Sequence, residues 1–297
     1  MIVQARNLPA PAKLNLFLHV TGRRADGYHL IETVFELIDW ADRVSLRLRE
    51  DGAIVRADPL PGVAADQDLA VRAARLLAER SGTRLGVEIS VDKRLPIGGG
   101  LGGGSSDAAT TLLALNRLWS LGWSSARLAN AALELGADVP FFVKGRSAYA
   151  TGIGEKLRAL SLPPRWYVIL APANGVATAS VFAAPELTRD TKPLKISGLS
   201  RGRQVFRGRN DLQPVVVARH PGVARALEAL RQAARAVGID ARLARMTGSG
   251  ACVFLPVRSE DDAARVRGRL EGRAEGAIAV ARSLPVHPLR DWAFAPN

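Results

Sequence analysis

The chain has 297 residues, of which 47% are apolar and 23% charged, a balance that fits one large or two ordinary globular domains. It has no apolar run near the roughly 20 residues of a membrane span, no signal-peptide pattern and one cysteine, Cys252, so we expect a cytoplasmic protein without membrane association or an internal disulfide. The net charge of +13 comes largely from scattered arginines, which favours a solvated basic surface over a nucleic-acid interface.

The first half of the chain alternates between strand and helix patterns. Apolar residues at every second position predict strands, and apolar residues three and four positions apart predict helices. The expected elements are strands at 14–20 and 43–49, a helix at 67–80 ended by Gly82, a strand at 85–91, and helices at 106–119 and 125–135. Ser105 or Ser106 can cap the helix at 106–119, and Asp107 suits the positive charge of its first turn.

The second half predicts the element order β-α-β-β-α-β. The expected elements are a strand at 166–171, a helix at 222–237, strands at 243–246 and 252–257, a helix at 261–270 and a strand at 277–284. This order suggests a ferredoxin-like module. Residues 172–215 insert after its first strand and show no clear pattern. We therefore expect an α+β protein with two closely packed domains, residues 1–155 and 156–297.

The most informative segment is a glycine-rich stretch between a predicted strand and a predicted helix. Residues 98–104 hold six glycines in seven positions, which are costly to order because glycine loses the most freedom on folding. Bare N–H groups next to a helix N-terminus form a cradle for an anion, usually phosphate. The stretch lacks the Gly-Lys-Ser/Thr ending of a P-loop, and the strand that a Rossmann fold needs does not follow the helix. A different kind of phosphate loop is expected.

Three segments resemble, in the same order, the motifs of the GHMP kinases (galactokinase, homoserine kinase, mevalonate kinase and relatives). They are Pro11-Ala-Lys-Leu-Asn15, residues 96–106 and Thr247-Gly-Ser-Gly-Ala251. Four segments, at 11–18, 24–29, 92–96 and 136–140, narrow the resemblance to the branch that phosphorylates 4-diphosphocytidyl-2-C-methyl-D-erythritol. The similarity is weakest at residues 185–208 and at the C-terminus.

The resemblance implies a two-domain GHMP kinase fold with an active site in the cleft between the domains. The N-terminal domain would resemble domain 2 of ribosomal protein S5, and the C-terminal domain would be ferredoxin-like. ATP would be the co-substrate and would phosphorylate the 2-hydroxyl of the acceptor, a step in the methylerythritol phosphate route to isoprenoid precursors. Mg²⁺ is expected because ATP is used as its magnesium complex, although we assign it no protein ligand. The expected partner is a small-molecule substrate, without nucleic acid, and the expected state is a monomer or weak homodimer.

Lys13 and Asp138 are the catalytic pair that the resemblance implies. Asp138 would accept the proton of the acceptor hydroxyl, and a neighbouring lysine would favour the ionised forms of both groups. By position alone, Asp138 would be an ordinary loop aspartate and Lys13 a surface lysine. Strand alternation directs Lys13 and Asn15 toward the cleft. The opposite face, toward the core, holds Leu14, Leu16 and Leu18.

The resemblance also implies two sets of ligand-binding residues. The ATP-binding residues are Pro96, Ile97, Gly98, Gly99, Gly100, Leu101, Gly102, Gly103, Gly104, Ser105 and Ser106. The substrate-binding residues are Asn15, Tyr28, His29, Lys93, Asp138, Thr178, Phe182, Gly248 and Ser249. Tyr28 would stack on the cytosine ring with Phe182 opposite, and His29 would hydrogen-bond to the edge of the base. Alone, a Tyr-His pair or a short glycine turn is more often structural.

Two alternatives remain open at this stage. The chain can be a GHMP kinase for another alcohol, such as homoserine or mevalonate. It can also be a basic RNA-binding protein with an S5-like domain, in which case its RNA affinity would depend steeply on salt and no ATP would turn over.

Overall fold

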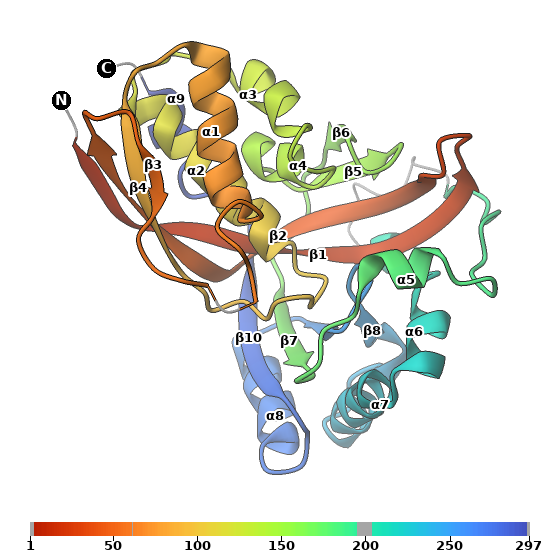
Figure 1. The fold of residues 1–297 in the computed structure, drawn as a ribbon. Helices are drawn as coiled ribbons and strands as arrows, with labels where there is room; N and C mark the ends of the chain where they lie inside the picture. The colour runs from red at the N-terminus through yellow and green to blue at the C-terminus, as the bar shows by residue number, and fades with distance from the viewer. Residues whose placement is uncertain (1–2, 61, 195–203, 296–297) are drawn as a thin grey trace.

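A hairpin of two very long strands runs through the molecule (Figure 1). Its strands are β1 (Gln4–Arg23) and β2 (His29–Arg49), which pair antiparallel along their length. The computed structural model describes residues 3–60, 62–194 and 204–295. The predicted strands at 14–20 and 43–49 lie within β1 and β2 and are confirmed. Both strands are longer than predicted, because they stay paired through segments whose polar and proline residues break the apolar alternation.

The first half of the chain builds a sheet on β2 and covers one face of it with helices (Figure 1). The added strands are β3 (Ile54–Arg56), β4 (Gly86–Asp92), β5 (Ala148–Thr151) and β6 (Lys156–Ala159). The helices are α1 (Leu69–Ser81), α2 (Gly103–Leu118), α3 (Ser125–Ala132) and α4 (Val139–Lys144). Their apolar faces meet β2 and β4 in one core cluster around α2. As predicted, α1 ends at Gly82, which takes the left-handed conformation (φ 70°).

Helix α2 begins three residues before its predicted start, and the serine cap expected for it is wrong. The residue that precedes the helix is Gly102, whose φ of 73° lies in the left-handed region, and no side chain caps this end. The N–H of Ser106 already donates to the Gly102 carbonyl as a helical bond, and its hydroxyl donates to the Pro11 carbonyl. The helix therefore starts with two glycines, Gly103 and Gly104, and no side chain caps the N–H groups at this end.

The second half has the predicted ferredoxin-like order of elements. They are β7 (Trp166–Ala171), α7 (Pro221–Ala236), β8 (Arg245–Met246), β9 (Val253–Val257), α8 (Glu260–Leu270) and β10 (Ala277–Leu284). Their strands lie in the antiparallel order β10-β7-β9-β8, which confirms the prediction. Side chains of β7 alternate between two cores: Val168 and Leu170 pack against α7 and α8, whereas Tyr167 and Ile169 pack against the β1–β2 hairpin.

The segment after β7 carries short helices rather than a separate fold. They are α5 (Thr178–Phe182), η2 (Gln204–Phe206), α6 (Gln213–Arg219) and, later, η3 (Ala241–Leu243). In Figure 1, α5 lies alongside the β1–β2 hairpin.

Strand β10 joins the two halves into one sheet, because Ser283 and Leu284 pair with β2. The chain then returns to the first half, where α9 (Arg290–Phe294) contributes Ala293 to the core around α2. The predicted boundary between residues 155 and 156 stays a prediction. Within the described ranges, no helix combines the length and the apolar character needed to cross a membrane.

Candidate active site

A pocket of about 950 Å³ lies between the β1–β2 hairpin, the glycine-rich loop, α5 and the turn at 248–249. The predicted site residues that line it are Lys13, Asn15, Tyr28, His29, Lys93, residues 96–105, Asp138, Thr178, Phe182, Gly248 and Ser249. Of the predicted residues only Ser106 lies away from its surface; it is fully buried behind the loop. The structure thus brings together residues that are up to 236 positions apart between Lys13 and Ser249.

Lys13 and Asp138 meet at the wall of this pocket. Lys13 Nζ lies 3.6 Å from Asp138 Oδ2, and the lysine side chain is 5% exposed whereas that of the aspartate is 33% exposed. Burial lowers the pKa of Lys13, and the nearby Asp138 carboxylate opposes that shift. Burial thus disfavours the charged form of Lys13 and the carboxylate favours it, and Asp138, the more exposed of the two, lines the pocket.

Asn15 holds Lys13 in place and ties it to the second half of the chain. Lys13 Nζ donates a 2.6 Å hydrogen bond to Asn15 Oδ1. Asn15 Nδ2 donates to the hydroxyl of Thr33 on β2, and the Asn15 backbone N–H donates to the hydroxyl of Thr247. Neither threonine was predicted to support the site: Thr33 lies outside every motif, and Thr247 opens the late glycine motif but was given no role of its own.

The prediction that the leucines of β1 face a core is right, but they face two different cores. Leu14 and Leu16 are fully buried between the hairpin and β7, whereas Leu18, 4% exposed, packs in the core of the second half and also borders the pocket. The register of β1 against β2 shifts between Asn15 and Leu18, which changes the face that the following residues present. Simple alternation cannot anticipate such a bulge.

The glycine-rich loop is fixed by hydrogen bonds from both halves of the molecule. The backbone N–H groups of Ala251 and Cys252 donate to the carbonyls of Gly98 and Gly99, and the N–H of Lys13 donates to the Leu101 carbonyl. A side chain has no room at the centre of the loop, because a Cβ atom on Gly100 would lie 2.3 Å from the Thr247 carbonyl oxygen. Positive φ angles at Gly98, Gly100 and Gly102, together with close neighbouring atoms at these positions, explain why they are glycine.

Lys93 lies beneath the start of α2, held by two carboxylates. Its Nζ donates to Asp107 Oδ2 at 2.7 Å and also to Asp42 Oδ2. Burial raises the pKa of Asp107 to about 7 although Lys93 opposes that shift. The other oxygen of Asp107, Oδ1, is buried without a hydrogen-bond partner among the described residues, and Asp107 lines the pocket. Lys93 therefore supports the loop near Gly103; its contact with substrate stays a prediction.

The far end of the pocket carries the residues predicted to hold a base. Tyr28 is 61% exposed, and the rings of His29 and Phe182 lie 5.1 Å apart. The hydroxyls of Thr178 and Ser249 share a 2.6 Å hydrogen bond that joins α5 to the late glycine turn. Sequence reasoning missed Arg189, which hydrogen-bonds to His29, because it lies in a segment without a motif.

Two family descriptions match the chain, "GHMP kinases N terminal domain" at residues 68–146 and "GHMP kinases C terminal" at residues 196–275. A 4-diphosphocytidyl-2-C-methyl-D-erythritol kinase from Aromatoleum aromaticum is 55% identical over 291 residues, which cover 98% of each chain. The chain belongs to this family of GHMP kinases. A family member from Thiobacillus denitrificans is 57% identical over 96% of this chain and 97% of its own.

Solved structures of this superfamily have the same fold. A crystal structure of 4-(cytidine 5'-diphospho)-2C-methyl-D-erythritol kinase matches with a TM-score of 0.75 and 35% identity, over 94% of this chain and 98% of that one. Homoserine kinase from Cytophaga hutchinsonii matches with a TM-score of 0.72 over 97% of this chain and 96% of its own, but at 18% identity this likeness concerns the fold alone. The expected two-domain GHMP kinase fold is confirmed.

Proposed function

We propose that this kinase transfers the γ-phosphoryl group of ATP to the 2-hydroxyl of 4-diphosphocytidyl-2-C-methyl-D-erythritol, a step of the methylerythritol phosphate route. The observation that carries the proposal is the Lys13–Asp138 pair, 3.6 Å apart, on the wall of a pocket that the glycine-rich loop also lines. A carboxylate beside an ammonium group suits an alcohol nucleophile, and a bare backbone cradle suits a polyphosphate.

In the proposed mechanism, the chain positions two substrates and manages one proton. The α2 N-terminus and the glycine-rich loop hold the phosphates, so the backbone dipole offsets part of their negative charge. The oxygen of the acceptor hydroxyl attacks the γ-phosphorus in line with the leaving ADP oxygen, and Asp138 accepts the proton of that hydroxyl. Lys13, paired with Asp138 and oriented by Asn15, stabilises the negative charge that builds up during transfer.

We further propose that Mg²⁺ enters with ATP. Among the described residues, no three His, Cys, Asp or Glu side chains cluster as a metal site, so phosphate oxygens would supply most of its ligands. The unpartnered Oδ1 of Asp107 and the hydroxyl of Ser105, both at the pocket, are the protein oxygens that fit such an ion. When bound, Mg²⁺ neutralises phosphate charge.

The test combines product identification with two isosteric variants. Incubation of the protein with Mg-ATP and 4-diphosphocytidyl-2-C-methyl-D-erythritol should yield ADP and the 2-phosphate, identified by mass spectrometry and ³¹P NMR. Asp138→Asn and Lys13→Met should each lower kcat by about 10²–10⁴-fold while the circular dichroism spectrum is unchanged. Lys144→Met, an exposed lysine at the end of α4, is the matched control and should keep normal turnover. Near-normal kcat in either site variant would disprove the catalytic assignment.

The predicted oligomeric state and the absence of a nucleic-acid partner belong to the same proposal. Homoserine or mevalonate should be phosphorylated far more slowly than the cytidylyl substrate, because neither presents a base to Tyr28 and His29. Light scattering should give a monomer or a weak homodimer. RNA affinity should be weak at physiological salt; tight binding without ATP turnover would favour the RNA-binding alternative.

A further inference from the structure

Arg189 makes four hydrogen bonds to the wall of the pocket at its base-binding end. Its Nε donates a 3.0 Å hydrogen bond to Nε2 of His29. Its two terminal nitrogens donate to the backbone carbonyls of Leu187, Phe182 and Ala184 at 2.7–3.1 Å. One guanidinium group therefore fixes both the His29 ring and the end of α5, which carries Phe182.

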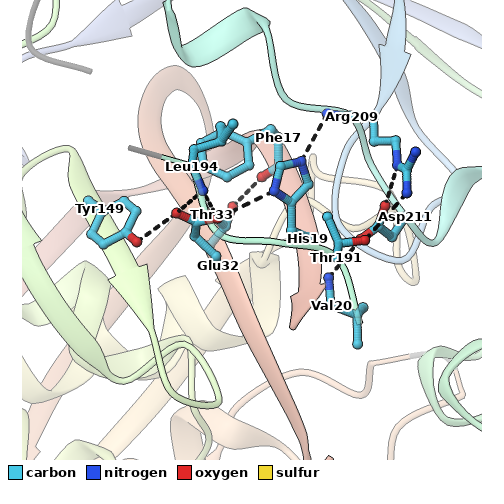
Figure 2. A network of polar contacts seen from close by, with 10 residues as sticks. All are labelled: Phe17, His19, Val20, Glu32, Thr33, Tyr149, Thr191, Leu194, Arg209 and Asp211. Atoms are coloured by element: carbon cyan, nitrogen blue, oxygen red, sulfur yellow. Dashed lines mark hydrogen bonds and ion pairs between the residues drawn. The ribbon is translucent and has the colours of Figure 1, made fainter. Parts of the chain in front are cut away.

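The segment that carries Arg189 is itself anchored on the β1–β2 hairpin (Figure 2). The backbone N–H of Leu194 donates to both oxygens of Glu32, at 3.1 and 3.0 Å, and Tyr149 donates to the same carboxylate at 2.7 Å. Figure 2 shows His19 on the other side of Glu32. Closer to Arg189 in the chain, the N–H of Thr191 donates to the carbonyl of Val20 on β1. These bonds tie the backbone just after Arg189 to β1 at Val20 and to β2 at Glu32, which supports the position of the guanidinium.

The contact with Arg189 determines which nitrogen of His29 carries the proton. Arginine has only donors, so Nε2 of His29 must accept with its lone pair. A neutral imidazole then carries its proton on Nδ1. Burial, Arg189 and Arg23 all lower the pKa of His29, which agrees with a neutral ring. Within the described part of the chain, Nδ1 has no hydrogen-bond partner, and His29 lines the pocket.

We propose that Arg189 is a positioning residue that locks His29 in the Nδ1–H tautomer, so that the ring donates a hydrogen bond to an acceptor atom on the edge of the substrate's pyrimidine. The inference rests on the proposed function, in which His29 contacts the cytosine. Cytosine presents a carbonyl oxygen and a lone-pair nitrogen on that edge, and both accept. A lysine would not replace Arg189, because it cannot hold the ring and three carbonyls with one planar group.

The first test is spectroscopic and needs no substrate. The chain has four histidines, so the ¹⁵N signals of His29 can be assigned by comparison with His29→Gln. The wild-type protein should show the Nδ1–H tautomer of His29, and Arg189→Met should show a mixture of tautomers. A wild-type His29 that is protonated on Nε2 would overturn the inference whatever the effect on activity.

The second test is binding of CDP and ADP, measured by calorimetry. Arg189→Met should weaken the binding of CDP roughly tenfold, the scale of one lost hydrogen bond, and leave the binding of ADP unchanged. KM for the cytidylyl substrate should rise while kcat at saturation stays near normal. Arg219→Met is the matched control: it removes an exposed ion pair to Glu186 on the same segment and should change neither ligand.

The outcomes separate this inference from the proposed function. If His29→Ala weakens CDP and Arg189→Met does not, Arg189 has no positioning role and the base site stands. If neither His29→Ala nor Arg189→Met changes the affinity for CDP, His29 does not contact the base, and that part of the proposed function fails as well. If Arg219→Met weakens CDP as much as Arg189→Met, loosening of the segment explains the effect and the tautomer lock is rejected.

Discussion

Glu36 should make the stability of this kinase depend on pH in an unusual direction. It lies on β2, 2% exposed, and accepts a hydrogen bond from the Tyr167 hydroxyl. Burial raises the pKa of Glu36 from 4.5 to about 7. The folded state therefore binds this proton more tightly than the unfolded chain does. As pH rises through the interval between these two values, the free energy of unfolding should fall.

The size of the effect follows from the pKa shift. The difference between a pKa of 4.5 in the unfolded chain and about 7 in the folded protein corresponds to about 3 kcal/mol of stability that is lost above pH 7. Glu36→Gln keeps the shape and an acceptor for Tyr167 but cannot ionise. The difference in unfolding free energy between variant and wild type should thus shift by about 3 kcal/mol in favour of the variant between about pH 4.5 and pH 8.

Urea unfolding at several pH values, followed by tryptophan fluorescence, measures this difference. The comparison with wild type cancels the contributions of other groups, such as His287, whose pKa burial lowers to about 3. Glu79→Gln, an exposed change on α1, is the control and should stay within about 0.5 kcal/mol of wild type at every pH. A variant that shows no pH-dependent gain over wild type, or that is less stable at about pH 8, would refute the reasoning.

Two further predictions concern the pocket. Gly100→Ala should abolish measurable ATP binding, because the new methyl group would collide with the Thr247 carbonyl. The control is Gly122→Ala, at a similar φ of 64° with open space around it. It should lower the free energy of unfolding by only about 1 kcal/mol and leave kcat unchanged. Normal ATP affinity in the Gly100 variant would contradict this account of the loop. Tyr28→Ala should leave the melting temperature unchanged, since the ring is 61% exposed, and should raise KM for the cytidylyl substrate roughly tenfold but not KM for ATP; equal effects on both would argue against stacking.

Local sequence patterns were sufficient for most elements of the fold. The strands at 166–171 and 277–284 have the predicted bounds, because their alternation follows a sheet with a core on each face. The start of α2 was misplaced, because glycine has a poor helix propensity and only the packing of the loop makes Gly103 helical. The motifs also indicated which residues would gather around the pocket, although they gave no distances.

The sequence by itself determined which functional groups the site contains: a bare glycine loop, a lysine, an aspartate and a Tyr-His pair, each within a motif of the family. The tertiary structure alone decided how they meet. Asn15 bonds to Thr247, Lys93 is shared by two carboxylates, and Arg189 reaches His29 across 160 residues of sequence. Such contacts depend on the register of β1 and β2 and on the path of the segment after α5. Both are set by packing between residues far apart in the sequence, and such packing produces no periodic pattern of apolar residues that could be recognised in the sequence.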